Sequence, residues 1–586
     1  MTFIYNYLLT KQHLNVVISS TYSSKEQINQ KFMRSMTMKN LTIIIFCIYQ
    51  LSAVTVHASE NPNHLNDINK HRLVIGIVVD QMRHDYISKY WNKYSDDGFK
   101  RMVREGFSFD DTHFDYMPTN TGPGHASVFT GTTPSIHGIM DNSWFDPNLR
   151  RSIYVTEDST VMSVGTHTDA GKMSPIFMLS STISDELRLT TNFRSKVVSI
   201  SLKDRGAILP GGHTGDAYWF DSTTGHFITS TYYRNELPVW LDVFNRDNHV
   251  GRLLSNDWIT LLPIETYVES IEDNNPYEGT FRGMESPTFP YKLPELVKNS
   301  GPGLIASTPF GNDLLVELAK SAITGETLGV NDVTDMLIIS FSSPDYIGHR
   351  FGPSSIEVQD TYLRLDQSLA ELFKYVDDYI GHENVLYFIT SDHGAAYNTN
   401  FLSDRNIPTG SLVRREIHSE LTDYTTRKYG FDPILHLGSS QIFLDLKKID
   451  DHNLKASEIS RDLSIKLLEF EGIAGALTYE DLLFNNYSDQ IRQAVQKGFN
   501  AQRSGQVLFW LKPNWFSSLR RTGTTHGTAW NYDTRAPLIF FGWNIKSGNT
   551  TIRSSITDIA PTLANILGIS YPSGNTGSPL NHFMNY

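Results

Sequence analysis

The chain has 586 residues, of which 40% are hydrophobic and 19% charged, and its formal net charge is −13. This composition is typical of a folded protein and excludes extensive disorder, and no repeat or low-complexity tract is visible. The acidic balance argues against sequence-independent binding to nucleic acid, which needs clustered Lys and Arg.

The N-terminal part of the chain has the features of an export signal. Lys39 precedes the apolar run LTIIIFCIYQLSAV, and a small-x-small cleavage pattern follows at residues 56–58. We interpret residues 1–58 as an N-terminal extension and a cleaved signal peptide, with Met36 or Met38 as the alternative start. A membrane anchor is the competing interpretation, but the run is shorter than the ~20 residues of a spanning helix. The sequence predicts a periplasmic or secreted protein without stable membrane insertion.

The only cysteine, Cys47, lies inside this leader. Cleavage leaves a mature chain without thiols, so neither disulfides nor thiolate ligands contribute to it.

The mature chain alternates strand-like and helix-like segments. Helical patterns cover residues 354–380 and 556–568. Short runs rich in β-branched and aromatic residues predict buried strands at 72–79, 197–202, 336–341, 385–390 and 537–541. The alternation predicts an α/β fold with a mostly parallel central sheet and helices on both faces.

Two long stretches are less regular and rich in Gly, Pro, Asn, Tyr and Trp. They cover about residues 206–330 and 400–525. Neither resembles a linker, so we expect them to be cap insertions in a single catalytic domain spanning residues 59–586.

Acid and imidazole side chains cluster where the apolar runs end. Open parallel sheets bind their ligands at the carboxyl ends of the strands. Oxygen and nitrogen ligands in this number suit two zinc-like ions, and cobalt or manganese would fit nearly as well. The sequence therefore predicts a metallohydrolase whose candidate ligands are Asp80, Asp345, His349, Asp392, His393 and His526.

Each ligand candidate has a simpler alternative. Asp345 and His349, four residues apart, share one helix face, which also suits a surface pair. Asp80 could instead cap a helix or pair with Arg83. His526, flanked by glycines, could be an ordinary loop residue.

Asp392 and His393 are adjacent, and neighbours on an extended strand point to opposite faces. One ion can hold both side chains only if the backbone turns, which Gly394 permits. Otherwise the two residues serve two ions on either side.

A hydroxyl nucleophile is suggested by the stretch PTNTGPGHASVFTG. Thr121 precedes a helix expected to start near His125, where free backbone N–H groups favour an alkoxide and an incoming phosphate. The alternative is a Thr helix cap. We assign His125 and His137 to structural roles, with contact to a metal ligand as the second possibility.

Lys203 and Arg205 alternate on an expected extended segment, so they can share a face and converge on one anion. A solvated strand end has the same pattern. Together with the metal ligands and Thr121, the two cations predict phosphoryl transfer.

On these residues and the block TGPGHASVFTGTTPSIHGIMDN, the chain resembles the alkaline phosphatase superfamily, and within it the phosphate-irrepressible, PafA-type bacterial enzymes. The resemblance spans residues 72–570. It implies two Zn²⁺ ions, one held by Asp345, His349 and His526. It implies that Asp80, Asp392 and His393 hold the other, with Thr121 as the nucleophile bridging towards it.

The resemblance also implies that Asn142, Lys203 and Arg205 bind the phosphate oxygens. The expected activity is hydrolysis of small-molecule phosphate monoesters through a phosphothreonine intermediate. A nucleotide pyrophosphatase or phosphodiesterase is the alternative, and in this superfamily it lacks the Lys-x-Arg pair. A sulfatase would need a C/S-x-P-x-R motif, which is not visible, and a protein that only binds metal or phosphate would lack the nucleophile or the cations. The oligomeric state is not predicted.

Overall fold

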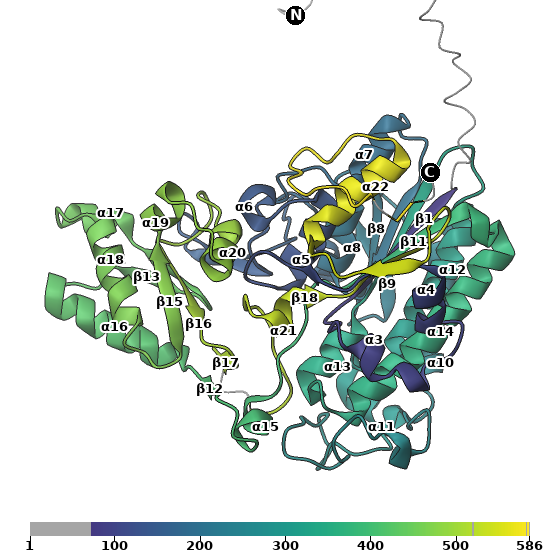
Figure 1. Ribbon diagram of the computed structural model, residues 1–586, viewed down its shortest axis with the longest axis horizontal. Coiled ribbons are helices and arrows are strands. Elements are labelled where there is room, and N and C mark those ends of the chain that lie inside the picture. Colours follow the sequence, from purple (N-terminus) through teal and green to yellow (C-terminus); the bar gives the residue numbers. More distant parts are fainter. Residues whose placement is uncertain (1–71, 518–520, 582, 585–586) are drawn as a thin grey trace, which may run out of the picture. The chain divides into compact units, whose positions relative to one another are not determined.

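A ten-stranded sheet forms the centre of the part of the chain that the computed structural model describes, residues 72–517, 521–581 and 583–584 (Figure 1). The predicted signal peptide, residues 1–58, lies outside the described residues. The strand order is β20-β2-β19-β11-β1-β10-β7-β8-β9-β6.

The middle of this sheet is parallel, and antiparallel pairs join the flanking strands to it, while β20 pairs parallel with β2 at one edge. The parallel strands are β11 (Val385–Thr390), β1 (Leu73–Val79), β10 (Asp335–Phe341), β7 (Val197–Ser201) and β8 (Asp216–Asp221). β19 (Leu538–Gly542) pairs antiparallel with β11 and with β2 (Phe107–Phe109). The remaining strands are β9 (His226–Ser230), β6 (Ser163–Val164) and β20 (Gly548–Thr550). The predicted α/β fold is confirmed, with a mixed sheet.

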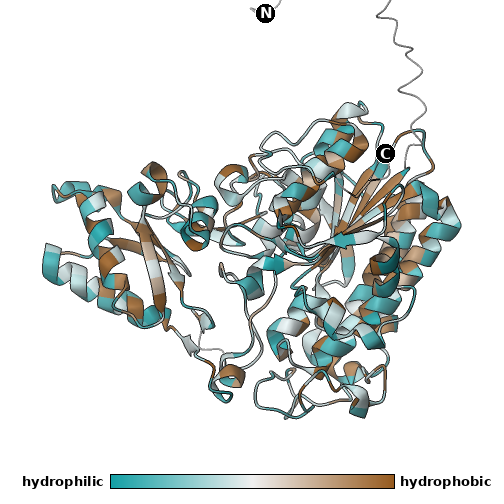
Figure 2. Ribbon diagram, viewed as in Figure 1, coloured by the Kyte–Doolittle hydropathy of each residue, from teal (hydrophilic) through white to brown (hydrophobic). Residues whose placement is uncertain are grey.

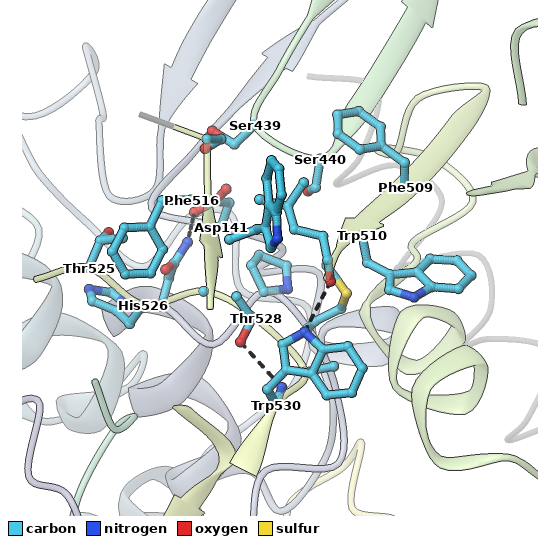
Figure 3. Close-up of a pocket in the computed structure, with 18 of the residues that line it drawn as sticks. Asp141, Ser439, Ser440, Phe509, Trp510, Phe516, Thr525, His526, Thr528 and Trp530 are labelled. Atoms are coloured by element: carbon cyan, nitrogen blue, oxygen red, sulfur yellow. Dashed lines mark hydrogen bonds between the residues drawn. The ribbon is translucent and has the colours of Figure 1, made fainter. Parts of the chain in front are cut away.

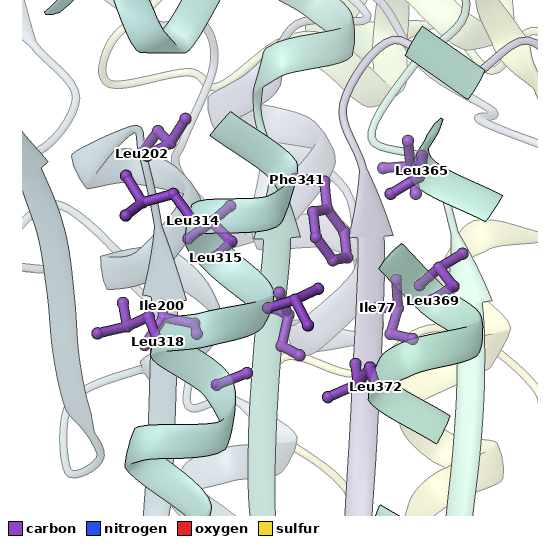
Figure 4. Packing of buried hydrophobic residues seen from close by; sticks show 14 of the residues in the cluster. Ile77, Ile200, Leu202, Leu314, Leu315, Leu318, Phe341, Leu365, Leu369 and Leu372 are labelled. Atoms are coloured by element: carbon purple, nitrogen blue, oxygen red, sulfur yellow. The ribbon is translucent and has the colours of Figure 1, made fainter. Parts of the chain in front are cut away.

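Both faces of the sheet are covered, since β1, β10, β7 and β11 are buried at every position. In β1, Ile75 and Ile77 face a core shared with α12 (Phe310–Glu326) and α14 (Ile356–Ile380), which Figure 4 shows. Val78 faces a second core, shared with α5 (Thr121–Thr130) and α22 (Ile559–Leu567). Burial of both faces explains why these strands are continuous hydrophobic runs (Figure 2).

The stretch 206–330 is not the cap that its irregular composition suggests. β8 and β9 extend the central sheet, and α12 packs on its face against α14. Loops rich in Pro and Asn connect these elements, and their composition concealed the regular segments.

The stretch 400–525 holds a four-stranded antiparallel sheet with a hydrophobic core of its own (Figure 1). Its strands are β13 (Ile434–Leu437), β14 (Gln441–Leu444), β16 (Val507–Leu511) and β15 (Ile473–Thr478). The helices α16 (Arg414–Tyr429) and α18 (Ala456–Leu467) pack against it. This segment is therefore more regular than expected.

In the described ranges, no helix has both the length and the apolar character that crossing a membrane requires.

Candidate active site

Four neighbouring parallel strands each deliver one charged side chain to the same edge of the sheet. β11, β1, β10 and β7 are adjacent, and all point the same way. The residues that follow them are, in that order, Asp392, Asp80, Asp345 and Lys203. Residues more than 300 positions apart thus meet because parallel strands end at a common edge.

One group of side chains that could hold a metal ion forms around α13 (Ser343–Phe351). His349 Nε2 lies 3.1 Å from Asp345 Oδ1, one helical turn away. His526 Nε2 lies 3.7 Å from the same oxygen and 3.3 Å from His349 Nε2. The interpretation of Asp345 and His349 as an isolated surface pair is wrong, since Asp345 is buried and His526 joins it.

A second group, formed by Asp80, Asp345 and His393, shares Asp345 with the first, and Asp392 lies beside it. His393 Nε2 lies 3.5 Å from Asp80 Oδ1 and 3.5 Å from Asp392 Oδ2. The backbone therefore turns so that Asp392 and His393 face the same point. Arg83 pairs with Asp85, not with Asp80, so the salt-bridge alternative for Asp80 is wrong.

All three imidazoles are held in the same manner. In each ring Nδ1 donates to a backbone carbonyl, which turns Nε2 towards the carboxylates. The bonds run from His349 to Thr524 (2.9 Å), from His526 to Thr119 (2.8 Å) and from His393 to Gly394 (2.9 Å). The Nε2 atoms of His349 and His526 face each other, so a proton or a metal cation must lie between them, and the orientation is compatible with metal binding.

Orphaned polar atoms support the same conclusion. Among the described residues, Asp80 Oδ1, Asp392 Oδ2 and His393 Nε2 are buried without a hydrogen-bond partner. Burying such atoms unpaired is costly, and a divalent cation would satisfy all three. The residues present fit a metal centre.

Thr121 is the first residue of α5 and is 1% exposed. Asn120 occupies the cap position, so the alternative role of Thr121 as a helix cap is wrong. The first turn of α5 packs on the metal-ligand cluster. A Cβ added to Gly124 would lie 2.8 Å from Asp392 Cβ, so only glycine allows this approach.

Asn142 reaches the same helix N-terminus. Its Oδ1 accepts the Gly122 N–H at 2.7 Å. Since Oδ1 is engaged, the Nδ2 group is the donor that Asn142 can offer to an anion beside Thr121.

Lys203 and Arg205 are not on an extended segment, contrary to the prediction. β7 ends at Ser201, and Lys203 is the N-cap residue of α8 (Asp204–Gly211), which carries Arg205 in its first turn. Asp204 accepts the Arg205 N–H at 2.5 Å and so favours the helix start. The Lys203 ammonium lies 2.6 Å from both Asp80 Oδ2 and Asp345 Oδ2.

The charges of the cluster shift its acids in opposite directions. Burial and the neighbouring Asp80 raise the pKa of Asp392 well above its usual range. Burial also opposes ionisation of Asp345, but His349 and Lys203 hold its pKa well below the usual range. The raised pKa of Asp392 indicates that this carboxylate lacks enough neighbouring positive charge, which suits a divalent cation beside it.

Two residues at this site escaped sequence reasoning. Gln81, in a left-handed conformation at φ 64°, donates from its backbone N–H to Asp392 Oδ1 and from Nε2 to Asp345 Oδ1. Tyr154 accepts from Arg205 Nη1 at 2.9 Å and donates to Asp204 Oδ1 at 2.6 Å. The only local sequence feature that could have indicated Gln81 was its position directly after Asp80. No local feature of the sequence indicated Tyr154.

Of the two histidines assigned to structure, His125 also touches a metal-ligand candidate. Its Nδ1 donates to the Thr121 carbonyl at 2.9 Å and lies 3.5 Å from Asp392 Oδ2. His137 contacts Ser127 Oγ at 3.0 Å and is wholly buried.

Residues 74–534 match the family described as type I phosphodiesterase / nucleotide pyrophosphatase. The chain belongs to this family.

Within the type I phosphodiesterase family, the chain is similar to proteins characterised as alkaline phosphatases. PafA of Elizabethkingia meningoseptica is 43% identical over 537 residues, 90% of this chain and 97% of the relative. PhoV of Synechococcus elongatus is 42% identical over 508 residues, 86% of this chain and 92% of the relative. A protein of Myroides odoratus named calcium-transporting ATPase is 42% identical over 551 residues, 93% of this chain and 99% of the relative.

The crystal structure of wild-type alkaline phosphatase PafA superimposes with a TM-score of 0.85 at 42% identity, covering 88% of this chain and 99% of that chain. The resemblance of this type I phosphodiesterase family protein to PafA-type alkaline phosphatases is therefore confirmed.

Proposed function

We propose that the protein is an alkaline phosphatase that hydrolyses small-molecule phosphate monoesters, with Thr121 as the nucleophile. One observation carries the proposal: two groups of inward-facing metal ligands adjoin the N-terminus of the helix that begins at Thr121. Thr121 lies between Thr119, whose carbonyl accepts from His526, and His125, which lies beside Asp392. The similarity to PafA and PhoV supports the same activity.

Two Zn²⁺ ions suit the donor set. Asp345, His349 and His526 would hold one ion. Asp80, Asp392 and His393 would hold the other, with Thr121 adjoining. Zinc bound there lowers the pKa of an adjacent hydroxyl and offsets negative charge on a leaving oxygen.

The protein's own groups then position two successive displacements. Thr121 Oγ1 attacks phosphorus as the bond to the leaving alcohol breaks, and that alcohol departs with a proton. Water next attacks the phosphothreonine, so that inorganic phosphate leaves and the Thr121 hydroxyl is restored. The backbone N–H groups in the first turn of α5 would stabilise the negative charge of the phosphate.

Lys203, Arg205 and Asn142 would bind the three non-bridging oxygens of a monoester. A diester carries less negative charge and has one of these oxygens esterified, so two cations would be partly unmatched. The family's name makes phosphodiester or pyrophosphate hydrolysis the second candidate. The Lys-x-Arg pair favours the monoester.

Replacement of the nucleophile tests the proposal. We expect Thr121→Ala to lower kcat/KM for 4-nitrophenyl phosphate by about 10³-fold or more, while Thr121→Ser retains much of the activity. Quenched wild-type protein should gain the mass of one phosphoryl group, and the alanine variant should not. Thr551→Ala, at an exposed position, is the matched control. Near-normal turnover by Thr121→Ala would reject the role.

Export to the periplasm or the medium is part of this proposal and rests on the leader at residues 39–58. N-terminal sequencing of protein recovered from the periplasm and the medium tests it. A new N-terminus at or soon after residue 59 supports cleavage, whereas an intact leader in the membrane fraction contradicts it.

A further inference from the structure

A cavity of about 280 Å³ adjoins the proposed catalytic centre (Figure 3). His526 and Asn142 belong to both, so the cavity begins where the metal ligands and the phosphate-binding groups end. His526 also belongs to the group of Asp345 and His349, and an ion held there would stabilise the leaving oxygen. An in-line displacement would move the leaving group away from Thr121 and towards that ion.

The walls of the cavity away from the metal ligands include several aromatic side chains. They come from β16 and β17 (Trp515–Phe516) of the inserted segment and from the loop that follows His526. The aromatic lining residues are Phe509, Trp510, Trp515, Phe516 and Trp530. Phe516 is only 4% exposed, so its ring is held inside the protein.

The arrangement of these rings suits a ligand that stacks. Trp530 Nε1 donates to the Leu511 carbonyl at 3.0 Å, which fixes the indole and satisfies its polar atom. Within the described residues, Trp510, Phe516 and Trp530 make no ring–ring contact with one another. None of the three rings stacks on another, while the Trp510 ring packs against Gly475.

The acidic side chain in the lining, Asp141, is hydrogen-bonded at one of its two oxygens. Its Oδ1 accepts from Asn120 Nδ2 and from the Asn142 backbone N–H, both at 2.6 Å. Apart from Asp141 and His526, the polar lining groups are uncharged hydroxyls, amides and indole N–H groups.

We propose that this cavity binds the leaving group of the substrate and selects phosphate monoesters whose leaving group carries a planar aromatic ring. The inference rests on the proposed phosphatase activity. Stacking against a fixed indole or phenyl ring is worth up to about tenfold in affinity beyond simple burial. A saturated ring of the same size buries similar area but cannot stack.

The test compares benzyl phosphate with cyclohexylmethyl phosphate, since both release primary alcohols of similar acidity and size. For the wild-type protein we expect kcat/KM to favour benzyl phosphate by about tenfold. The variants Phe516→Leu and Trp530→Leu should reduce this ratio towards one. Phe484→Leu, at a ring 77% exposed and outside the cavity, should leave the ratio at the wild-type value.

A binding measurement on the wild-type protein needs no variant to fold. Benzylphosphonate should inhibit about tenfold more strongly than cyclohexylmethylphosphonate. The inference would be overturned if the two esters were hydrolysed equally well and the two phosphonates inhibited equally strongly. It would also be overturned if the Phe516 and Trp530 variants lowered kcat/KM for both esters by the same factor. Methyl phosphate separates the two proposals. If the protein hydrolyses methyl phosphate but does not prefer benzyl phosphate over cyclohexylmethyl phosphate, only the role of the cavity is refuted. Failure to hydrolyse any monoester refutes the proposed function itself.

Discussion

The ammonium of Lys203 lies 2.6 Å from a carboxylate oxygen of Asp345 and is almost wholly buried. The neighbouring Asp80 carboxylate is equally near, and together these acids raise the Lys203 pKa despite its burial. The lysine is therefore charged throughout the working pH range and available to a phosphate oxygen.

Removal of this charge should affect monoesters more than diesters. We expect Lys203→Met to lower kcat/KM for 4-nitrophenyl phosphate by about 100-fold, and that for methyl 4-nitrophenyl phosphate by much less. The exposed Lys374→Met is the control. If kcat/KM fell equally for both substrates while the metal content stayed unchanged, Lys203 would not discriminate between a monoester and a diester by their charge.

Asp345 belongs to both groups of metal ligands, whereas His349 belongs to one. Asp345→Asn should therefore reduce bound metal more than His349→Ala does, and both should lower activity. Elemental analysis of the purified variants checks this, with the exposed His167→Ala as the control. If Asp345→Asn retained full metal content, the sharing of this carboxylate would be wrong.

Tyr154 connects Arg205 to Asp204 through two hydrogen bonds, and so acts as a positioning residue. Hydrogen bonds to charged groups contribute about 1.5–3 kcal/mol, so Tyr154→Phe should lower kcat/KM for a monoester roughly tenfold or more. The loss should be smaller in an Arg205→Ala background, because Tyr154 acts through the arginine. Tyr379→Phe, at a half-exposed ring, serves as the control. Additive losses would contradict the linkage.

A buried acid pair should make stability depend on pH. Glu278 and Glu357 are 5% and 0% exposed, and burial raises their pKa values from 4.5 to about 10 and about 8. The folded state therefore holds protons that the unfolded state releases above pH 4.5. Stability is greatest below that pH and falls as the pH rises through the folded pKa values.

A neutral side chain at this pair removes the dependence. Glu278→Gln should flatten the fall in Tm between pH 6 and pH 10, and raise Tm by roughly 2 °C or more at the alkaline end. The exposed Glu471→Gln should match the wild-type curve. If the curves of Tm against pH ran parallel for Glu278→Gln and the wild type, ionisation of the pair would not destabilise the folded protein.

The sequence by itself determined the central strands and the chemical type of the site. Continuous apolar runs could only be buried on both faces, so β1, β7, β10, β11 and β19 were predictable to within one residue at each end. Acids that close such runs had to meet at one sheet edge, since parallel strands end together. The resemblance of the chain to PafA-type enzymes added the remaining residues of the set.

The tertiary structure alone decided how distant segments combine. The antiparallel direction of β19, the helical start at Lys203 and the turn that brings Asp392 and His393 together depend on contacts with other elements. The hydrophobic pattern of a segment predicts that the segment is buried. It does not predict the direction of a strand or the partner of a side chain, because both depend on residues far away in the chain. For the same reason, Gln81, Tyr154 and the aromatic cavity beside His526 became visible only in the folded protein.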